Sequence, residues 1–341
     1  MEVAGEPRAV VEALRGWFAG DGTERLVVAT SGSSGRPKRV VLPRAAVEAS
    51  VAASHRRVGG DGRWVLRLPA TYVAGVQVLS RALLAGTEPV LDEEPWPDDS
   101  GWCTSLVPTQ LHRVLTGSGA GETDAAADLA ALRRAHVVLL GGGPVDPALR
   151  RAATDAGVRV VATYGAAETA GGCVYDGVPL DGVALATGER GRVRVAGPTL
   201  FEGYDGDPAL TAETLVDGWY LTGDAGRLDE DGRLQVLGRL DDVVVSGGVN
   251  VPGPAVAARL RAHPGVEAAE VVGVPDPEWG NRLVAFVVGE AAHDVAALRA
   301  WVVAEHPRAW APRQVVALDD VPLLPNGKPD RVRLRELAGE A

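Results

Sequence analysis

The sequence has few cysteines and no long apolar run, and both shortages restrict what the protein can be. Its two cysteines, Cys103 and Cys173, are too few for a disulfide framework and show no metal-ligand spacing, which is expected of a cytoplasmic protein. The most apolar stretch, residues 73–86, is interrupted by Arg81, so we expect no membrane span. The first 20 residues carry acidic side chains and lack an apolar core, which argues against a signal peptide.

Positive charge is also in the minority. Lys and Arg total 34 against 45 Asp and Glu, so the formal net charge is −11. This balance repels phosphate backbones and argues against a nucleic-acid partner, although a local nest of backbone N–H groups could still bind one anionic ligand. The 341 residues, 46% hydrophobic and 23% charged, are enough for two globular domains.

Short apolar runs alternate with helical stretches in the first half of the chain. We expect strands at 25–30, 64–69, 136–140 and 158–163, and helices at 44–57, 73–85 and 147–156. This alternation predicts a mostly parallel sheet covered by helices. From residue 191 the pattern changes to strands with tight turns, including the hairpin signal Asp231-Gly232, which predicts an antiparallel subdomain.

A smaller α/β unit is expected after Arg239. We expect helices at 254–262 and 295–305, and strands at 270–274, 283–288 and 314–318. The boundary between the two units is expected near residues 238–242. We therefore predict an ATP- and acid-binding domain at 1–239 and a mobile C-terminal domain at 240–341.

The segment from Thr30 to Lys38 reads TSGSSGRPK and directly follows a predicted strand. Small hydroxyl residues, glycines and a final lysine can converge on phosphate oxygens, because glycine lets the backbone come close. The segment is not a Walker A loop, since Pro37 stands where that pattern needs glycine. The alternative is a flexible surface turn.

Two acidic residues lie in short polar motifs. Glu168, in YGAAET, comes after the strand at 158–163, and ligands of open α/β sheets bind at the carboxyl ends of strands. A carboxylate there suits Mg²⁺ shared with phosphate oxygens, and a helix N-terminal glutamate is the alternative. Asp224, in LTGD, is either a turn cap or an acceptor for ribose hydroxyls.

Residues near the C-terminal unit are less informative by themselves. The segment 238–256 carries paired acids and a Gly-Gly step, which a hairpin with solvated charges would explain. Lys328, in LPNGKPDR, lies on a Gly/Pro-rich turn with no predicted helix beside it, where an isolated lysine usually faces solvent.

Taken in this order, the segments resemble the adenylate-forming superfamily of acyl-CoA synthetases, nonribosomal-peptide adenylation domains and luciferases. The resemblance covers about residues 25–331 and rests on the phosphate loop, YGxxET, TGD, GRxDD and the PxGK lysine. It implies an α/β adenylate-forming fold with a large N-terminal α/β domain, truncated at its start, and a small C-terminal α+β domain.

Four further segments resemble the o-succinylbenzoate–CoA ligase family of menaquinone biosynthesis. They are LPATYVAGVQVLSRALLAG (68–86), SLVPTQLHRVL (105–115), LLGGGPV (139–145) and GGCVYDGVPLDGV (171–183). This resemblance implies an AMP-forming acid–thiol ligase that uses ATP, Mg²⁺ and coenzyme A. The chain departs from the pattern in beginning close to the phosphate loop, so much of the usual N-terminal subdomain is expected to be absent, and in having Tyr72 where many relatives have histidine.

The resemblance implies a role for each matching residue. Contacts to the β- and γ-phosphates are implied for Thr30, Ser31, Gly32, Ser33, Ser34, Gly35 and Lys38. Contacts to adenine are implied for Gly141, Gly142, Gly143, Tyr164 and Gly165, and contacts to Mg²⁺ and phosphate for Glu168 and Thr169. The ribose is assigned to Asp224 and Arg239, the reacting carboxylate and α-phosphate to Lys328, and the hinge and CoA side to Asp241, Gly247 and Gly248.

The acid pocket is predicted around Thr71, Tyr72 and Arg81. o-Succinylbenzoate has a second carboxylate, and burying it without a partner costs several kcal/mol, so the pocket needs a cation or several donors. Arg81 is the one charge in residues 73–85, and its guanidinium can grip a carboxylate with two hydrogen bonds. The alternative is an arginine at a helix end that reaches solvent.

Two other functions are open at this point. One is an adenylation enzyme that loads another aryl or acyl acid onto CoA or a carrier-protein thiol, against which the segment 171–183 argues. The other is a nucleotide-binding protein without turnover, against which the retention of Glu168, Asp224 and Lys328 argues. The expected partner is a small carboxylic acid, and a homodimer is left open.

Overall fold

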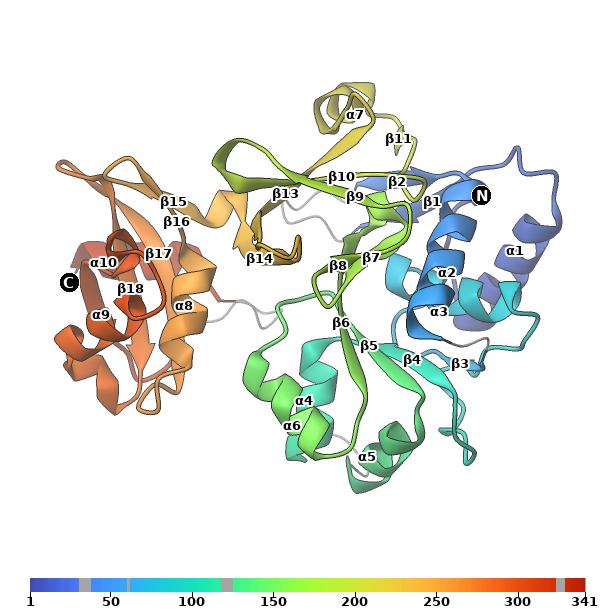
Figure 1. Cartoon of the computed structure of the whole chain (residues 1–341), viewed down its shortest axis with the longest axis horizontal. Helices are drawn as coiled ribbons and strands as arrows, with labels where there is room; N and C mark the ends of the chain where they lie inside the picture. Colours follow the sequence, from blue (N-terminus) through green and yellow to red (C-terminus); the bar gives the residue numbers. More distant parts are fainter. Residues whose placement is uncertain (31–37, 60–61, 118–124, 323–328, 341) are drawn as a thin grey trace. The chain divides into compact units, whose positions relative to one another are not determined.

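A computed structural model of the chain describes residues 1–30, 38–59, 62–117, 125–322 and 329–340 (Figure 1). The chain divides into two compact units. The first consists of Met1–Ala186, Arg194–Leu221 and Asp229–Leu234, and the second of Thr187–Val193, Thr222–Leu228 and Gln235–Ala341.

The first unit is built around a six-stranded sheet in the order β3–β4–β5–β6–β7–β8. Strands β3 to β6 are parallel, and β7 and β8 run antiparallel to their neighbours. The predicted mostly parallel sheet is therefore confirmed. Its strands are β3 (Trp64–Val65), β4 (Cys103–Leu106), β5 (Val137–Leu140), β6 (Val160–Ala166), β7 (Gly171–Tyr175) and β8 (Val178–Pro179).

Helices cover both faces of this sheet, and strand β5 shows why the sequence allows it. All four of its residues are buried, as expected of a strand enclosed on both faces. Val138 and Leu140 join a core with residues of α4, α5 and α6, while α2 and α3 lie on the other side (Figure 1). The helices are α1 (Pro7–Ala19), α2 (Arg44–Val58), α3 (Val73–Leu84), α4 (Pro108–Thr116), α5 (Ala125–Arg134), α6 (Pro147–Asp155) and α7 (Pro208–Thr214).

The three helices predicted in the first half, α2, α3 and α6, are confirmed. Helix α6 begins where the sequence provides a cap, because the Asp146 carboxylate accepts a hydrogen bond from the Ala148 N–H at 2.7 Å and Pro147 occupies the first helical position. In the described parts of the chain, no helix has both the length and the apolar character needed to cross a bilayer.

The strand expected at 25–30 exists, but the prediction that it belongs to the parallel sheet is wrong. It forms β1 (Leu26–Ala29), which pairs antiparallel with β2 (Arg39–Leu42). Strand β2 in turn pairs antiparallel with β11 (Gly203–Tyr204). The short connection between β1 and β2 explains the difference, since a parallel pair needs a crossover of a dozen or more residues.

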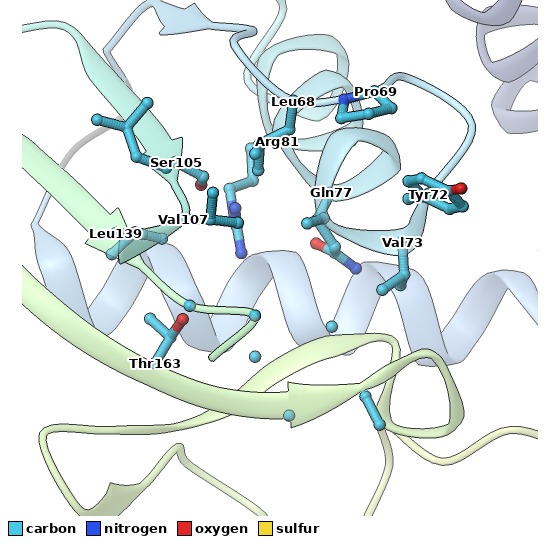
Figure 2. Close-up of a pocket in the computed structure, with 18 of the residues that line it drawn as sticks. Leu68, Pro69, Tyr72, Val73, Gln77, Arg81, Ser105, Val107, Leu139 and Thr163 are labelled. Carbon is cyan, nitrogen blue, oxygen red and sulfur yellow. The ribbon is translucent and has the colours of Figure 1, made fainter. Parts of the chain in front are cut away.

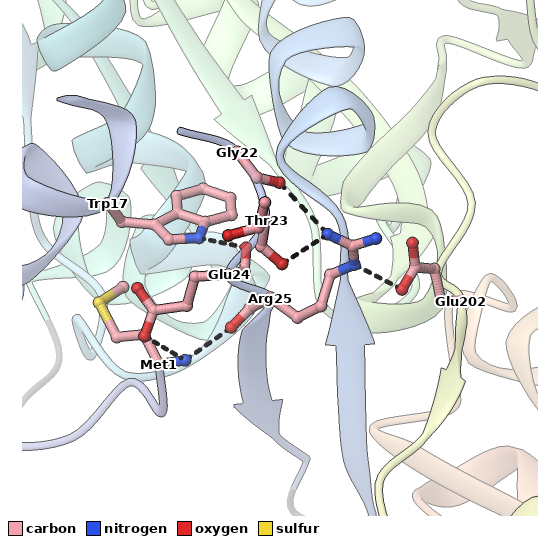
Figure 3. A network of polar contacts seen from close by, with 7 residues as sticks. All are labelled: Met1, Trp17, Gly22, Thr23, Glu24, Arg25 and Glu202. Carbon is pink, nitrogen blue, oxygen red and sulfur yellow. Dashed lines mark hydrogen bonds and ion pairs between the residues drawn. The ribbon is translucent and has the colours of Figure 1, made fainter. Parts of the chain in front are cut away.

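A polar network supports this small sheet at its start (Figure 3). The Met1 amino group donates to the Arg25 carbonyl at 2.7 Å, and the Trp17 indole N–H donates to the Glu24 carbonyl at 3.0 Å. The Arg25 guanidinium donates to the Glu202 carboxylate at 2.6 Å. Residues from the N-terminal segment, from just before β1 and from just before β11 are thereby held together, although no local sequence signal predicted the contact.

Strands with tight turns follow, as predicted from residue 191 onward. A five-stranded sheet has the order β12–β13–β10–β9, with β14 paired to β13. The hairpin signal is confirmed, because Gly232 has φ +75° in the turn that joins β13 to β14. The strands are β9 (Ala184–Thr187), β10 (Arg192–Ala196), β12 (Leu215–Val216), β13 (Trp219–Leu228) and β14 (Leu234–Arg239).

The rest of the second unit contains the five helices and strands predicted after residue 239, with small changes at their ends. They are α8 (Gly253–Arg261), β17 (Ala268–Asp276), β18 (Gly280–Val288), α9 (Val295–Val303) and β19 (Gln314–Ala317). The hairpin β15 (Val243–Ser246) and β16 (Val249–Pro252) precedes them, and helix α10 (Arg331–Glu340), which was not predicted, follows. Strands β17, β18 and β19 form one sheet that packs against α8 and α10.

Candidate active site

The two ends of the predicted phosphate loop are held together by hydrogen bonds. The Thr30 N–H donates to the Lys38 carbonyl at 2.9 Å, and the Lys38 N–H donates to Thr30 Oγ1 at 3.3 Å. The chain therefore leaves β1 and enters β2 at one place, as a closed loop requires. The remaining predicted ligands of the loop lie outside the described residues: Ser31, Gly32, Ser33, Ser34 and Gly35.

Glu168 follows β6 directly, within the single helical turn Ala167–Thr169, which agrees with its predicted position at a strand end. Its side chain is buried, and its Oε1 accepts a hydrogen bond of 2.7 Å from the Tyr204 hydroxyl. The Lys38 ammonium lies 5.3 Å from the centroid of the Tyr204 ring. Burial and the adjacent Glu168 carboxylate raise the pKa of Tyr204 above its ordinary value, so the hydroxyl is a donor.

The environment of Glu168 fits a magnesium ion that is shared with a nucleotide. Among the described residues, the Tyr204 hydroxyl is the hydrogen-bond partner of this carboxylate, so acceptor capacity remains. The described ranges contain no group of three His, Cys, Asp or Glu side chains that could form a metal cage. Mg²⁺ is usually held by one or two carboxylates together with substrate phosphates, so a single carboxylate is a suitable donor.

A strained turn keeps Glu168 in place. Ala170, two residues later, has φ 49°, which is uncommon for a residue with a side chain. Its carbonyl oxygen accepts hydrogen bonds from Gln77 Nε2 at 2.6 Å and from Ser50 Oγ at 2.9 Å. Helices α2 and α3 thus clamp the backbone that follows the carboxylate.

Thr169 is part of the same turn. Its hydroxyl donates to the Gly171 carbonyl at 2.7 Å and accepts from the Ala166 N–H at 2.9 Å, and its side chain is buried. The structure therefore gives Thr169 a role in shaping the turn, and its contact to ATP stays a prediction.

A cavity of about 220 Å³ lies between helix α3 and the sheet (Figure 2). Its walls include the apolar side chains of Leu68, Val107 and Leu139. Glycine is required at one wall, because a Cβ on Gly165 would lie 2.1 Å from a backbone oxygen. The glycines that line the cavity are Gly141, Gly142, Gly165, Gly171 and Gly172.

Arg81 is the cation of this cavity. Its side chain is 3% exposed, so the alternative in which it reaches solvent is wrong. One Nη donates to the Tyr175 hydroxyl at 3.2 Å, and the guanidinium lies 4.8 Å from the centroid of the Trp64 ring. The buried Nε has no hydrogen-bond partner, and among the described residues no carboxylate pairs with the guanidinium. A buried charge of this kind is expected to bind an anion.

Gln77 is a second polar group in the cavity wall, and the sequence analysis missed it. Figure 2 shows Gln77 and Arg81 extending from α3 toward the strand that carries Thr163. The Gln77 amide nitrogen is engaged with Ala170, whereas its buried Oε1 lacks a hydrogen-bond partner. Its position four residues before Arg81, on the same face of a mostly apolar helix, was the signal that could have identified it.

Only some of the other residues predicted for the acid and adenine sites line this cavity. Tyr72 lines the cavity and is 46% exposed, whereas Thr71 is not among the lining residues. Gly141, Gly142 and Gly165 line it as well, but Gly143 and Tyr164 do not. The structure thus brings the predicted aromatic residue, the cation and most of the glycines to one cavity.

The predicted ribose residues lie together in the second unit. Arg239 Nη1 donates to Asp224 Oδ1 at 3.0 Å, and the two side chains are 49% and 20% exposed, respectively. The Arg239 guanidinium lies close over Gly223 of TGD, where a Cβ would be 2.3 Å from it. The partly exposed pair offers an acceptor and a donor, which is what a ribose diol requires.

The predicted hinge and CoA residues also lie in the second unit. Asp241 belongs to the single helical turn Leu240–Asp242, and the neighbouring Asp242 pairs with Arg331. Gly247 and Gly248, with φ 57° and 76°, form the turn between β15 and β16. Lys328, the predicted catalytic lysine, lies outside the described residues, and helix α10 begins three residues after it.

Comparison with known families places the chain. The AMP-binding enzyme family matches residues 26–205, more than half of the chain, and the AMP-binding enzyme C-terminal domain matches residues 255–328. The chain therefore belongs to the AMP-binding enzyme family. Its fold is the adenylate-forming fold, as the ordered motifs predicted.

Similar proteins and structures are consistent with this assignment. A probable 2-succinylbenzoate–CoA ligase of Mycobacterium tuberculosis is 41% identical, with 93% of this chain and 85% of the relative covered. A 2-succinylbenzoate–CoA ligase of Listeria monocytogenes is 30% identical, with coverages of 91% and 69%. The o-succinylbenzoate CoA synthetase of Bacillus subtilis, solved with its acyl-adenylate intermediate, has TM-score 0.73 and 25% identity, with coverages of 91% and 68%. The amide bond synthetase McbA of Marinactinospora thermotolerans has TM-score 0.74 and 30% identity, with coverages of 92% and 68%.

Proposed function

We propose that this chain is an AMP-forming ligase that adenylates o-succinylbenzoate and transfers the acyl group to coenzyme A in menaquinone biosynthesis. The observation that carries the proposal is Arg81, a buried cation without a described counter-ion in the cavity of α3. One carboxylate of the di-acid would react while the other pairs with Arg81. The ligases of Mycobacterium tuberculosis and Listeria monocytogenes support this choice of substrate.

The reaction proceeds in two steps. A carboxylate oxygen attacks the α-phosphorus of ATP, the bond from that phosphorus to the bridging oxygen breaks, and pyrophosphate leaves. The thiolate of CoA then attacks the acyl carbon, and the bond from that carbon to the AMP oxygen breaks. Negative charge grows on the α-phosphate during the first step, so a cation there lowers the barrier, and we assign this task to Lys328.

We assign the residues around ATP as the resemblance to the adenylate-forming superfamily implies. The closed loop from Thr30 to Lys38 would hold the β- and γ-phosphates, and Asp224 with Arg239 would hold the ribose. Glu168 would bind Mg²⁺, which when bound neutralises phosphate charge. The hydrogen bonds that the Ala170 carbonyl accepts hold the backbone that follows this carboxylate.

We propose further that residues 240–341 form a domain that moves between the two steps. Asp241 would act as the hinge, because a few residues at the end of an element can absorb a large φ/ψ change. The turn at Gly247 and Gly248 would face CoA. The small acid, ATP and CoA are then the ligands, and no nucleic acid is involved.

The proposal is tested by mass spectrometry of the products formed from ATP, CoA and a panel of aromatic keto acids. We expect o-succinylbenzoyl-CoA together with AMP and pyrophosphate. If another acid forms a CoA thioester with a higher kcat/KM, that acid and not o-succinylbenzoate is the substrate. Transfer to a phosphopantetheinyl carrier protein but not to CoA would replace the acceptor, and absence of pyrophosphate release with every acid would refute adenylation.

A further inference from the structure

Tyr204 lies between two predicted ATP-site residues that are far apart in the sequence. Its hydroxyl donates to Glu168 Oε1 at 2.7 Å, and the ammonium of Lys38 lies 5.3 Å from its ring centroid. No motif in the sequence pointed to this tyrosine. We propose that Tyr204 is a positioning residue that orients the Glu168 carboxylate for the binding of a magnesium–nucleotide complex.

The surroundings of Tyr204 hold its side chain in one position. Its N–H donates to Thr211 Oγ1 at 2.8 Å, and it pairs with Val40 across the β2–β11 ladder. The Phe201 ring packs against it with a centroid separation of 5.0 Å, and its side chain is 6% exposed. The hydroxyl therefore approaches Glu168 from a fixed direction.

A fixed donor has a definite effect on a metal-binding carboxylate. The hydrogen bond from Tyr204 engages one oxygen of Glu168 and fixes the plane of the carboxylate. The lone pairs that stay free for a metal ion then keep a fixed orientation. The ring of the same tyrosine also contacts the Lys38 ammonium through a cation–π interaction. Loss of such an outer partner typically weakens metal affinity about tenfold to a hundredfold.

The Tyr204→Phe variant removes the hydroxyl and keeps the ring. We would measure by calorimetry the affinity of the full chain for the α,β-methylene analogue of ATP, once in EDTA and once in excess Mg²⁺. In EDTA the variant should bind the nucleotide as tightly as the parent does. Mg²⁺ should raise the nucleotide affinity of both proteins, and this increase, the Mg²⁺-dependent gain, should be about tenfold smaller in the variant. Arg56→Met on helix α2 is the control, because Arg56 lies at the surface, where it pairs with Asp181, and this variant should keep the full gain.

A double-mutant cycle separates positioning from structural damage. In a Glu168→Gln background, Tyr204→Phe should have no further effect on the Mg²⁺-dependent gain. Equal losses in EDTA and in Mg²⁺, additive losses in the cycle, or an unchanged gain would each overturn the inference.

The inference rests on the proposed function only through the Mg²⁺–nucleotide at Glu168. Normal Mg²⁺-dependent binding without any acyl-CoA product would overturn the proposed function alone. A parent protein whose nucleotide affinity does not respond to Mg²⁺ would overturn the inference, whatever the product assay shows.

Discussion

Replacing Arg81 tests whether the cavity reads a second carboxylate. Arg81→Met removes the charge and keeps much of the side-chain length, so the wall of the cavity should stay filled. A lost charged hydrogen bond costs about 1.5–3 kcal/mol, which corresponds to roughly a tenfold to a hundredfold loss in kcat/KM for o-succinylbenzoate. Arg81→Ala should lose at least as much, because it also leaves a cavity beside Trp64.

The assay compares the di-acid with a mono-acid analogue that lacks the ring carboxylate. The parent should prefer the di-acid, and Arg81→Met should lose this preference while the KM for ATP stays nearly the same. Arg56→Met on helix α2 is the matched control, because Arg56 is 58% exposed and forms its ion pair with Asp181 at the surface. A variant that discriminates between the two acids as well as the parent does would refute the role of Arg81.

The same substitution has an expected effect on stability. The Arg81 guanidinium is buried, and its Nε lacks a partner, so the charge is costly to hold without a ligand. We therefore expect the Tm of ligand-free Arg81→Met to equal or exceed that of the parent, whereas o-succinylbenzoate should raise the Tm of the parent more than that of the variant. A large loss of Tm without ligand would indicate that Arg81 is a structural residue.

Three other predictions follow from the chemistry of single residues. Lys328→Ala should nearly abolish adenylate formation and spare thioester formation from pre-made acyl adenylate, as measured by pyrophosphate release and by CoA consumption; equal losses would contradict the step assignment. Asp241→Pro, which locks φ near −65°, should slow one half-reaction much more than the other, and unchanged overall turnover would rule out a hinge there. Burial raises the pKa of Cys103 to about 11 and that of Cys173 to about 12, so at pH 8 about one Cys103 thiol in a thousand is ionised; iodoacetamide should label neither until the chain is unfolded, and rapid labelling of the native enzyme would contradict the burial.

Predictions based on local signals succeeded where a few neighbouring residues decide the conformation. The start of α6 was predicted at residue 147, where Asp146 caps the helix, and Asp231-Gly232 marks the turn between β13 and β14. The Glu168 position at the end of β6 followed from an apolar run in the sequence and a polar segment directly after it. Helix caps, turns and hydrophobic periodicity act within about four residues, so they can be read along the chain.

Predictions failed where the partner of a segment is distant or ambiguous. Leu26–Ala29 is apolar enough for a buried parallel strand, yet its short connection to Arg39–Leu42 makes it part of an antiparallel sheet. The sequence shows that Arg81 is a charge within an apolar helix. Whether its side chain reaches solvent or a cavity depends on which face of α3 other elements cover, and the sequence does not show that.

The family, the order of its motifs and the identities of Glu168 and Arg81 could thus be obtained from the sequence, because each depends on residue type and short spacing. The contacts of these residues could not. Gln77 reaches the carbonyl of Ala170 across 93 positions, and Tyr204 reaches Glu168 across 36. Such pairs form because helices and strands pack in three dimensions, and whether a polar group finds a partner there depends on the packing of the whole unit.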